Sequence, residues 1–259
     1  NWNELTGPAV DAFDIGGEGK EAAGPGGMSQ WLARLRDRPK NKPFFMWFAS
    51  HDAHRPWNAG TFNGVHRPAD LRVPPYMIDT PETREDLAHY YDEIARFDHH
   101  IGEVLDEIAR QGVQDNTVVI VTSDNGRPFA HSKTQLYEDG IKMPLIVRWP
   151  QAGLQPRRTD SLASALDVAP TVLELAGVAR PASVQGVSLV PILKDPSARV
   201  RDFVFAEHNW HNFPSHVRMV RAGNLVYMRN AWPDLPLSGR WNDPSSAALS
   251  VARTAGRLT

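Results

Sequence analysis

Three short apolar runs interrupt an otherwise mixed pattern of polar and apolar residues. They read FFMWFA at 44–49, TVVIVT at 117–122 and MPLIVRW at 143–149. Continuous apolar runs of this length, rich in aromatic and β-branched residues, are typical of strands buried on both faces. The pattern therefore predicts three buried strands.

A helical spacing occupies the chain between the first two runs. Apolar residues from Leu87 to Ile108 recur every three or four positions, which predicts one long helix that begins at Pro81 and stops near Gly112. A shorter apolar stretch that ends in glycine predicts another helix at 167–178. Strands and helices in alternation indicate an α/β fold with a mainly parallel sheet sandwiched by helices.

The pattern changes toward the C-terminus. FVFAEH, HVRMVR and LVYMRN are short runs, and Ala-Gly-Asn at 222–224 predicts a hairpin turn between the last two. A small antiparallel sheet is expected here. We therefore divide the chain into an α/β domain at 1–195 and the start of a C-terminal α+β subdomain at 196–259.

Charge and composition narrow the classes of partner. The chain has 28 Lys and Arg against 30 Asp and Glu, a formal net charge of -2, and 41% hydrophobic residues. This balance predicts a globular protein and gives no basis for a nucleic-acid groove. The apolar runs are far shorter than the roughly 20 residues of a membrane span, so none is expected. The sequence does not indicate a number of subunits.

The chain contains no cysteine, which excludes disulfides, thiolate metal sites and a cysteine nucleophile within these residues. The first residues, NWNELTG, contain no leader sequence, so we expect the biological start to lie elsewhere. Residues 14–27 are rich in glycine and predict an exposed loop.

Polar residues follow the second apolar run, where a strand of an open α/β sheet would deliver them to a ligand. Asp124 and Asn125 offer a charged and a neutral oxygen side by side, which suits calcium or magnesium, and Gly126 allows a sharp turn. Taken alone, these residues are better explained by an Asx turn. The same holds for His51, His54 and Lys133, each of which has an ordinary structural explanation.

The motifs together, from about residue 42 to 193, resemble the sulfatase family. They read PFFMWFASHDAHRPW, YYDEIARFDHHIGEVLDEI, NTVVIVTSDNG, KTQLYEDGIKMPLIVRWP and SALDVAPTVLELAGV. The resemblance implies an alkaline-phosphatase-like α/β fold. It also implies a calcium-dependent hydrolase that removes sulfate, with a formylglycine made from cysteine or serine as the nucleophile that attacks sulfur.

The resemblance also implies roles for single residues. Asp124 and Asn125 match the pair that completes the calcium site, His54 matches a histidine that contacts sulfate, and Lys133 falls at a cationic sulfate contact. A cation, a lysine and a protonated histidine would neutralise charge on the sulfate oxygens, and one of the two side chains could protonate the leaving group. Further candidates around the substrate are His51, Arg55 and His131.

A finer resemblance joins the chain to the sulfamidases within that family. The link from Asp-Asn-Gly to Lys133 is short, and the stretch AEHNWH at 206–211 is also similar. We therefore expect a sulfated carbohydrate or a small sulfated molecule as substrate. Glu207, His208 and His211 are candidate substrate-selecting residues, with a solvated loop as the equally weighted alternative.

The sequence departs from the family pattern near its start. The two adjacent aspartates and the C/S-x-P-S-R stretch that yields formylglycine are missing, and the final SVARTAGRLT reads as the start of a helix. We therefore interpret the chain as an inactive fragment of a longer enzyme. Two alternatives stay open: a phosphodiester or phosphonate hydrolase of the alkaline phosphatase superfamily, and a non-catalytic sulfatase-like binding protein. Family resemblance favours a periplasmic or extracellular location.

Overall fold

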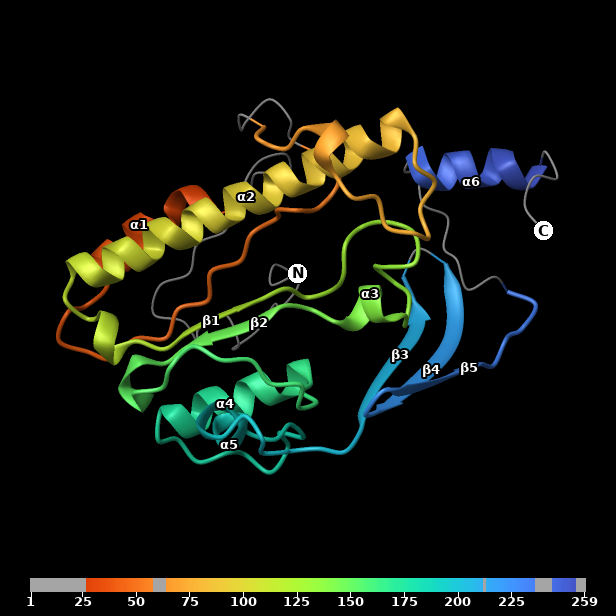
Figure 1. The fold of residues 1–259 in the computed structure, drawn as a ribbon. Helices are drawn as coiled ribbons and strands as arrows, with labels where there is room; N and C mark the ends of the chain where they lie inside the picture. The colour runs from red at the N-terminus through yellow and green to blue at the C-terminus, as the bar shows by residue number, and fades with distance from the viewer. Residues whose placement is uncertain (1–26, 58–63, 212, 236–243, 255–259) are drawn as a thin grey trace. The chain divides into compact units, whose positions relative to one another are not determined.

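The computed structural model describes residues 27–57, 64–211, 213–235 and 244–254 (Figure 1). The predicted glycine-rich loop at 14–27 lies outside them, except for Gly27. The chain forms two compact units, and each is described by itself. Unit 1 comprises Asn1–Thr117, Pro128–Ala130 and Arg240–Thr259, and unit 2 comprises Val118–Arg127 and His131–Gly239.

The secondary structure of unit 1 is helical in its described part. The long predicted helix is confirmed as α2, which begins after the N-cap Thr80, whose side chain accepts a hydrogen bond of 3.1 Å from the Thr83 amide. The helix α1 lies along α2 (Figure 1). These elements are α1 (Met28–Asp37), the 3-10 turns Pro68–Asp70 and Gln114–Asn116, α2 (Pro81–Arg110) and α6 (Pro244–Thr254).

Aromatic side chains join the parts of unit 1. Trp31 of α1 stacks on Phe48 with ring centroids 5.2 Å apart and meets the edge of Phe97 of α2 at 6.1 Å. A second cluster of buried side chains consists of the fully buried Phe129, of Met77, which precedes α2, and of Leu87 in α2. Phe129 thus places the short segment Pro128–Ala130 in the core of unit 1.

Unit 2 contains two antiparallel sheets. β1 (Val119–Thr122) pairs with β2 (Leu145–Arg148), and β3 (Val204–Trp210), β4 (Pro214–Ala222) and β5 (Leu225–Asn230) form a three-stranded sheet in that order (Figure 1). The predicted C-terminal antiparallel sheet is thus confirmed. The helices of unit 2 are α3 (Glu138–Ile141), α4 (Val168–Leu175) and α5 (Val190–Lys194), with 3-10 turns at Pro150–Ala152 and Ala165–Asp167.

The strand predicted at 44–49 is not formed. The segment is free of assigned secondary structure, and its exposure alternates: Phe45 is 59% and Trp47 62% exposed, whereas Phe44, Met46 and Phe48 are half-buried. This alternation is that of an extended chain. An apolar run indicates a local preference for an extended backbone. A β-strand also needs a neighbouring strand with which to form a hydrogen-bonded ladder, and no described strand pairs with this segment.

The pairing of β1 with β2 also differs from the parallel expectation. Val119 faces Arg148 and Thr122 faces Leu145, in antiparallel register. A parallel pair requires a long crossover, usually through a helix. The connection at 123–144 instead forms turns and the four-residue α3, so β2 returns alongside β1 in the opposite direction. All strand pairs among the described residues are antiparallel.

The core of unit 2 next to this connection is formed by Leu136, Val217 and Met219. Leu136 belongs to the connection, and the other two belong to β4. The three-stranded sheet therefore supports the loop that carries Lys133. The predicted domain boundary at residue 195 stays a prediction.

Candidate functional site

Asp124 and Asn125 follow the end of β1 at Thr122. The Ser123 hydroxyl donates to the Asn125 carbonyl at 3.2 Å, and the Asn125 side-chain nitrogen donates to the Gly126 carbonyl at 2.8 Å. The amide nitrogen is thereby engaged, so the side-chain oxygen of Asn125 remains available. The exposed Asp124 carboxylate has no hydrogen bond or ion pair with other described residues. Two oxygens suited to a hard cation thus stand at this strand end.

The Asp-Asn-Gly turn is braced by the turn that contains α3. The Gly126 amide donates to the Gly140 carbonyl at 3.0 Å, and Arg127 donates to the Asp139 carboxylate at 3.2 Å. A side chain on Gly126 would place its Cβ 1.9 Å from the Asp139 carbonyl oxygen. Only glycine permits this approach, so the Tyr-Glu-Asp-Gly stretch has a structural role beside the candidate site.

Lys133 lies on a tightly turned part of the same loop. Its amide donates to the Arg127 carbonyl at 3.0 Å. His131 and Thr134, on either side, have left-handed backbone angles with φ of 60° and 68°, a conformation that is costly for residues other than glycine. Within the described part of the chain, the Lys133 ammonium group has neither a hydrogen bond nor an ion pair. Its charge is therefore available to an anion.

His51, His54 and Arg55 lie together on the segment after residue 49. The His54 amide donates to the His51 carbonyl at 2.7 Å, and His54 Nδ1 lies 2.6 Å from the Arg55 carbonyl oxygen. Because a carbonyl only accepts, Nδ1 carries a proton, which leaves Nε2 of this exposed ring for a ligand. The His51 side chain is also exposed.

The sequence analysis missed Asp52, which fixes this segment to α2. Asp52 accepts two hydrogen bonds of 2.6 Å from Arg96, and the two side chains are only 1% and 4% exposed. Glu93 lies 3.5 Å from the same guanidinium. Ile94 beside it is instead 38% exposed, so the predicted apolar face of α2 is charged here. The i, i+3 pair Glu93–Arg96 was the available signal.

Glu207, His208 and His211 lie on β3 or just after it. Glu207 is exposed and pairs with Arg218 of β4 at 3.2 Å. The His208 ring meets the edge of Phe213 at 5.3 Å, and its buried Nε2 has no partner among the described residues. Burial, and to a lesser degree the charge of His211, lowers the pKa of His208. A neutral His208 is therefore favoured in the folded chain.

This shift predicts a pH dependence of stability. The unfolded chain binds a proton at His208 near the ordinary pKa of about 6.5, whereas the folded chain binds it only at lower pH. Stability should therefore fall as pH decreases below that value, over the interval between the two pKa values. His208→Gln should reduce this loss in thermal unfolding at pH 5 relative to pH 7.5, while His216→Gln serves as the control. An equal loss in wild type and His208→Gln contradicts the prediction.

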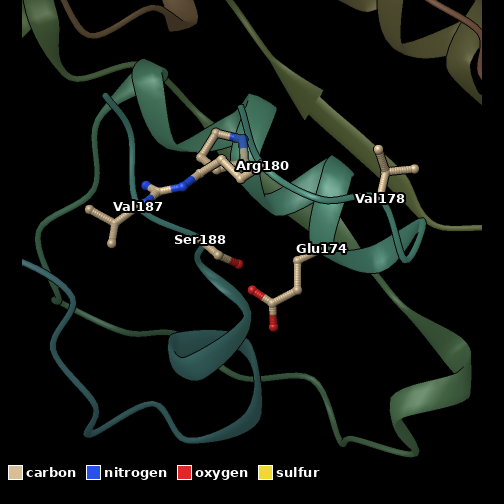
Figure 2. Close-up of a pocket in the computed structure, with 6 residues that line it drawn as sticks. Glu174, Val178, Arg180, Val187 and Ser188 are labelled. Atoms are coloured by element: carbon tan, nitrogen blue, oxygen red, sulfur yellow. The ribbon is translucent and has the colours of Figure 1, made fainter. Parts of the chain in front are cut away.

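A separate cavity of about 370 Å³ lies in unit 2 and contains none of the predicted residues. Figure 2 shows Glu174 of α4 and Ser188 of the later segment pointing toward one another in it. Arg180, which also lines it, donates to the Gly186 carbonyl at 2.8 Å. The residues that line this cavity are distant in sequence from both loops described above.

Two features are absent from the described residues: a cluster of metal ligands and a membrane-spanning helix. No group of three or more His, Cys, Asp or Glu side chains is arranged to hold a metal ion. Among the same residues, no helix has the length and apolar character that crossing a membrane requires.

Comparison with known proteins establishes the class. The Sulfatase family model matches residues 27–178, so the chain belongs to the sulfatase family, whose members are hydrolases. Over 85% of its length, the chain is 34% identical to human N-sulphoglucosamine sulphohydrolase. Over 81%, it is 28% identical to an ulvan-active sulfatase of Formosa agariphila. The predicted resemblance is confirmed.

The chain spans 51% and 36% of the lengths of these two relatives. A solved structure from a glycosaminoglycan-metabolising locus of Bacteroides thetaiotaomicron has a TM-score of 0.62 at 22% identity, over 81% of this chain and 53% of that one. This likeness confirms the alkaline-phosphatase-like fold class, although the strand pairing differs in the ways described above.

Proposed function

We propose that the protein to which these residues belong hydrolyses a sulfate ester or sulfamate bond of a sulfated sugar. The proposal rests on a sulfatase-family chain in which Asp124 and Asn125 offer two available oxygens. The same loop bears the Lys133 ammonium group, which has no partner among the residues that the structure describes. Cation ligands and a free cation on one loop suit the binding of an anion such as sulfate.

Asp124 and Asn125 would hold a divalent cation, with calcium as the preferred ion. A carboxylate and an amide oxygen are the ligands such an ion selects, but calcium takes six to eight oxygens. The remaining ligands would therefore come from outside the described residues or from water. The bound ion would supply neutralisation of negative charge on the sulfate oxygens.

Lys133 and His54 have complementary roles in the proposal. The ammonium group of Lys133 would bind sulfate oxygens and stabilise charge that develops on them. His54 has its Nδ1 fixed by the Arg55 carbonyl, so its Nε2 could donate a hydrogen bond to sulfate or a proton to the leaving amine or alcohol. The nucleophile, a formylglycine in the proposal, lies outside this cysteine-free chain.

Other side chains would contact the sugar. His51 is exposed on the His54 segment, and Glu207 and His211 are exposed on β3 and after it. The similarity to N-sulphoglucosamine sulphohydrolase supports a glucosamine N-sulfate as substrate. The proposed contacts to the sugar are His51, His131, Glu207, His208 and His211.

The function is tested with the longest natural gene product that contains these residues. N-sulfated and 6-O-sulfated glucosamine are supplied separately, and free sulfate and free amine are measured. We expect sulfate from the N-sulfated sugar with an equal amount of new amine. Sulfate from the O-sulfated sugar alone would refute the sulfamidase assignment, and sulfate from neither would refute the hydrolase.

Two substitutions test the residues in the same protein. Asp124→Ala should weaken calcium binding, measured by calorimetry, because it removes the only charged ligand of the pair. Lys133→Ala should lower kcat/KM by roughly 10- to 100-fold, the range for loss of a hydrogen bond to a charged group. Lys42→Ala, an exposed lysine elsewhere, is the control. Unchanged values in either variant remove that residue from the site.

A further inference from the structure

Within unit 1, the side chain of Arg55 joins α2 to the short segment Pro128–Ala130, which lies between Asp124 and Lys133 in the sequence. We propose that Arg55 is a positioning residue, which fixes the backbone of Pro128–Ala130 against the 51–57 segment instead of binding substrate. This inference deepens the proposed function and rests on it for its significance. The contacts themselves are independent of any ligand.

The guanidinium of Arg55 is occupied by protein groups. Its Nε donates to the Pro128 carbonyl oxygen at 3.0 Å, and its Nη1 donates to the Asp86 carboxylate at 2.9 Å. Its Nη2 binds the other oxygen of the same carboxylate. Asp86 belongs to α2, and its side chain is 8% exposed. Three of the five donors are thus directed into the protein and away from a substrate.

Aromatic rings surround the same guanidinium. Its central carbon lies 4.5 Å from the ring centroid of Trp57 and 4.8 Å from that of Phe129. Trp57 also donates from its indole nitrogen to Asp86. Because Phe129 is fully buried with Leu87, the ion pair lies against an apolar cluster. Cation–π contacts are strengthened by such desolvation.

The backbone connects this cluster directly to the proposed ligands. Arg55 follows His54, and its carbonyl accepts the hydrogen bond that orients the His54 ring. On the other loop, two consecutive carbonyls are used: Arg127 accepts from the Lys133 amide, and Pro128 accepts from Arg55. A displacement of Arg55 would therefore release the backbone at His54 and the Pro128–Ala130 segment, which precedes Lys133 in the chain.

An arginine is needed for this arrangement. One planar group must bind both oxygens of Asp86, donate to the Pro128 carbonyl and lie against two rings. A lysine would retain the charge, but its single ammonium cannot reproduce the fork or the planar contact. Arg55→Lys therefore tests the geometry of the guanidinium group while the positive charge is kept.

The test is hydrogen exchange of the 259-residue chain, which requires neither metal nor activity. In Arg55→Lys, amide exchange in peptides that cover 50–57 and 126–133 should accelerate at least about tenfold, as expected when a charge-assisted hydrogen bond is lost. Peptides from the second half of α2 and from β3–β5 should keep their wild-type rates. Asp86→Asn should accelerate the same two peptides less.

The matched control is Arg84→Lys. Arg84 also binds both oxygens of an aspartate, Asp79, at 2.6 and 2.7 Å. It differs from Arg55 in that its backbone acceptors include the Leu71 carbonyl, which belongs to another segment. The Arg84→Lys substitution should leave the amide exchange rate of the peptide 126–133 unchanged. Unchanged exchange at 126–133 in Arg55→Lys overturns the proposal, as does equal acceleration across the whole chain. Failure of the hydrolase assay alone leaves this result unaffected.

Discussion

Gly126→Ala is expected to destabilise the chain by about 3 kcal/mol or more, at the upper end of the cost of forced overpacking. A Cβ at this position would lie 1.9 Å from the Asp139 carbonyl oxygen and 2.8 Å from the Gly140 Cα. These are backbone atoms, so they cannot rotate away as a flexible side chain could. The substitution should also break the hydrogen bond from the Gly126 amide to Gly140. Chemical denaturation followed by circular dichroism measures the effect.

Gly102→Ala provides the matched control. Gly102 lies within α2, and a Cβ there meets no other atom within 4 Å. Since alanine has a higher helix propensity than glycine, this variant should be more stable by up to about 1 kcal/mol. The same chemical change is thus expected to have opposite signs at the two positions. If Gly126→Ala unfolds at the wild-type denaturant concentration, the close contact between the two turns does not exist in solution.

Asp52→Ala is expected to cost about 3 kcal/mol, the lower part of the range for breaking a buried ion pair. Arg96 would remain only 4% exposed, without the carboxylate oxygens of Asp52 to which it donates two hydrogen bonds of 2.6 Å. The hydrogen bonds to Asp52 raise the pKa of Arg96 against the opposing effect of burial, so the arginine stays charged. Glu93, at 3.5 Å, retains part of the compensation and limits the loss.

Urea denaturation at pH 7 measures this effect, and Asp70→Ala is the control. Asp70 pairs with Arg67, but both side chains are more than half exposed, and such pairs contribute at most about 1 kcal/mol. A loss in Asp52→Ala no larger than in Asp70→Ala contradicts a buried, fixed pair. Asp52→Asn should be intermediate because it keeps the shape and one acceptor.

Local sequence patterns were sufficient to predict several secondary-structure elements. α2 follows from its helical spacing, the capping Thr80 and the C-terminal Gly112, all of which act within a few residues. The hairpin from β4 to β5 follows from the Ala-Gly-Asn turn, in which Gly223 has φ of 53°. The family followed from motifs, and the match over residues 27–178 confirms it.

Long-range contacts decided other features. The run at 44–49 remained extended without a paired strand, and β1 and β2 paired in antiparallel register. Strand pairing depends on which distant segment supplies the hydrogen bonds, and a local apolar run contains no information about it. Similarly, Asp52 and Arg96 form a buried pair although they are 44 residues apart in the sequence.

The sequence by itself determined the long helix, the C-terminal hairpin, the family and the residue types of the proposed cation and sulfate site. These depend on periodicity, turn chemistry and motif spacing, which involve residues close together in the chain. Only the tertiary structure decided that Arg55 is held by Asp86, Trp57 and Phe129, and that Gly126 must be a glycine because a distant turn lies against it. Such roles arise from contacts between segments, and the free energy of those contacts depends on three-dimensional packing.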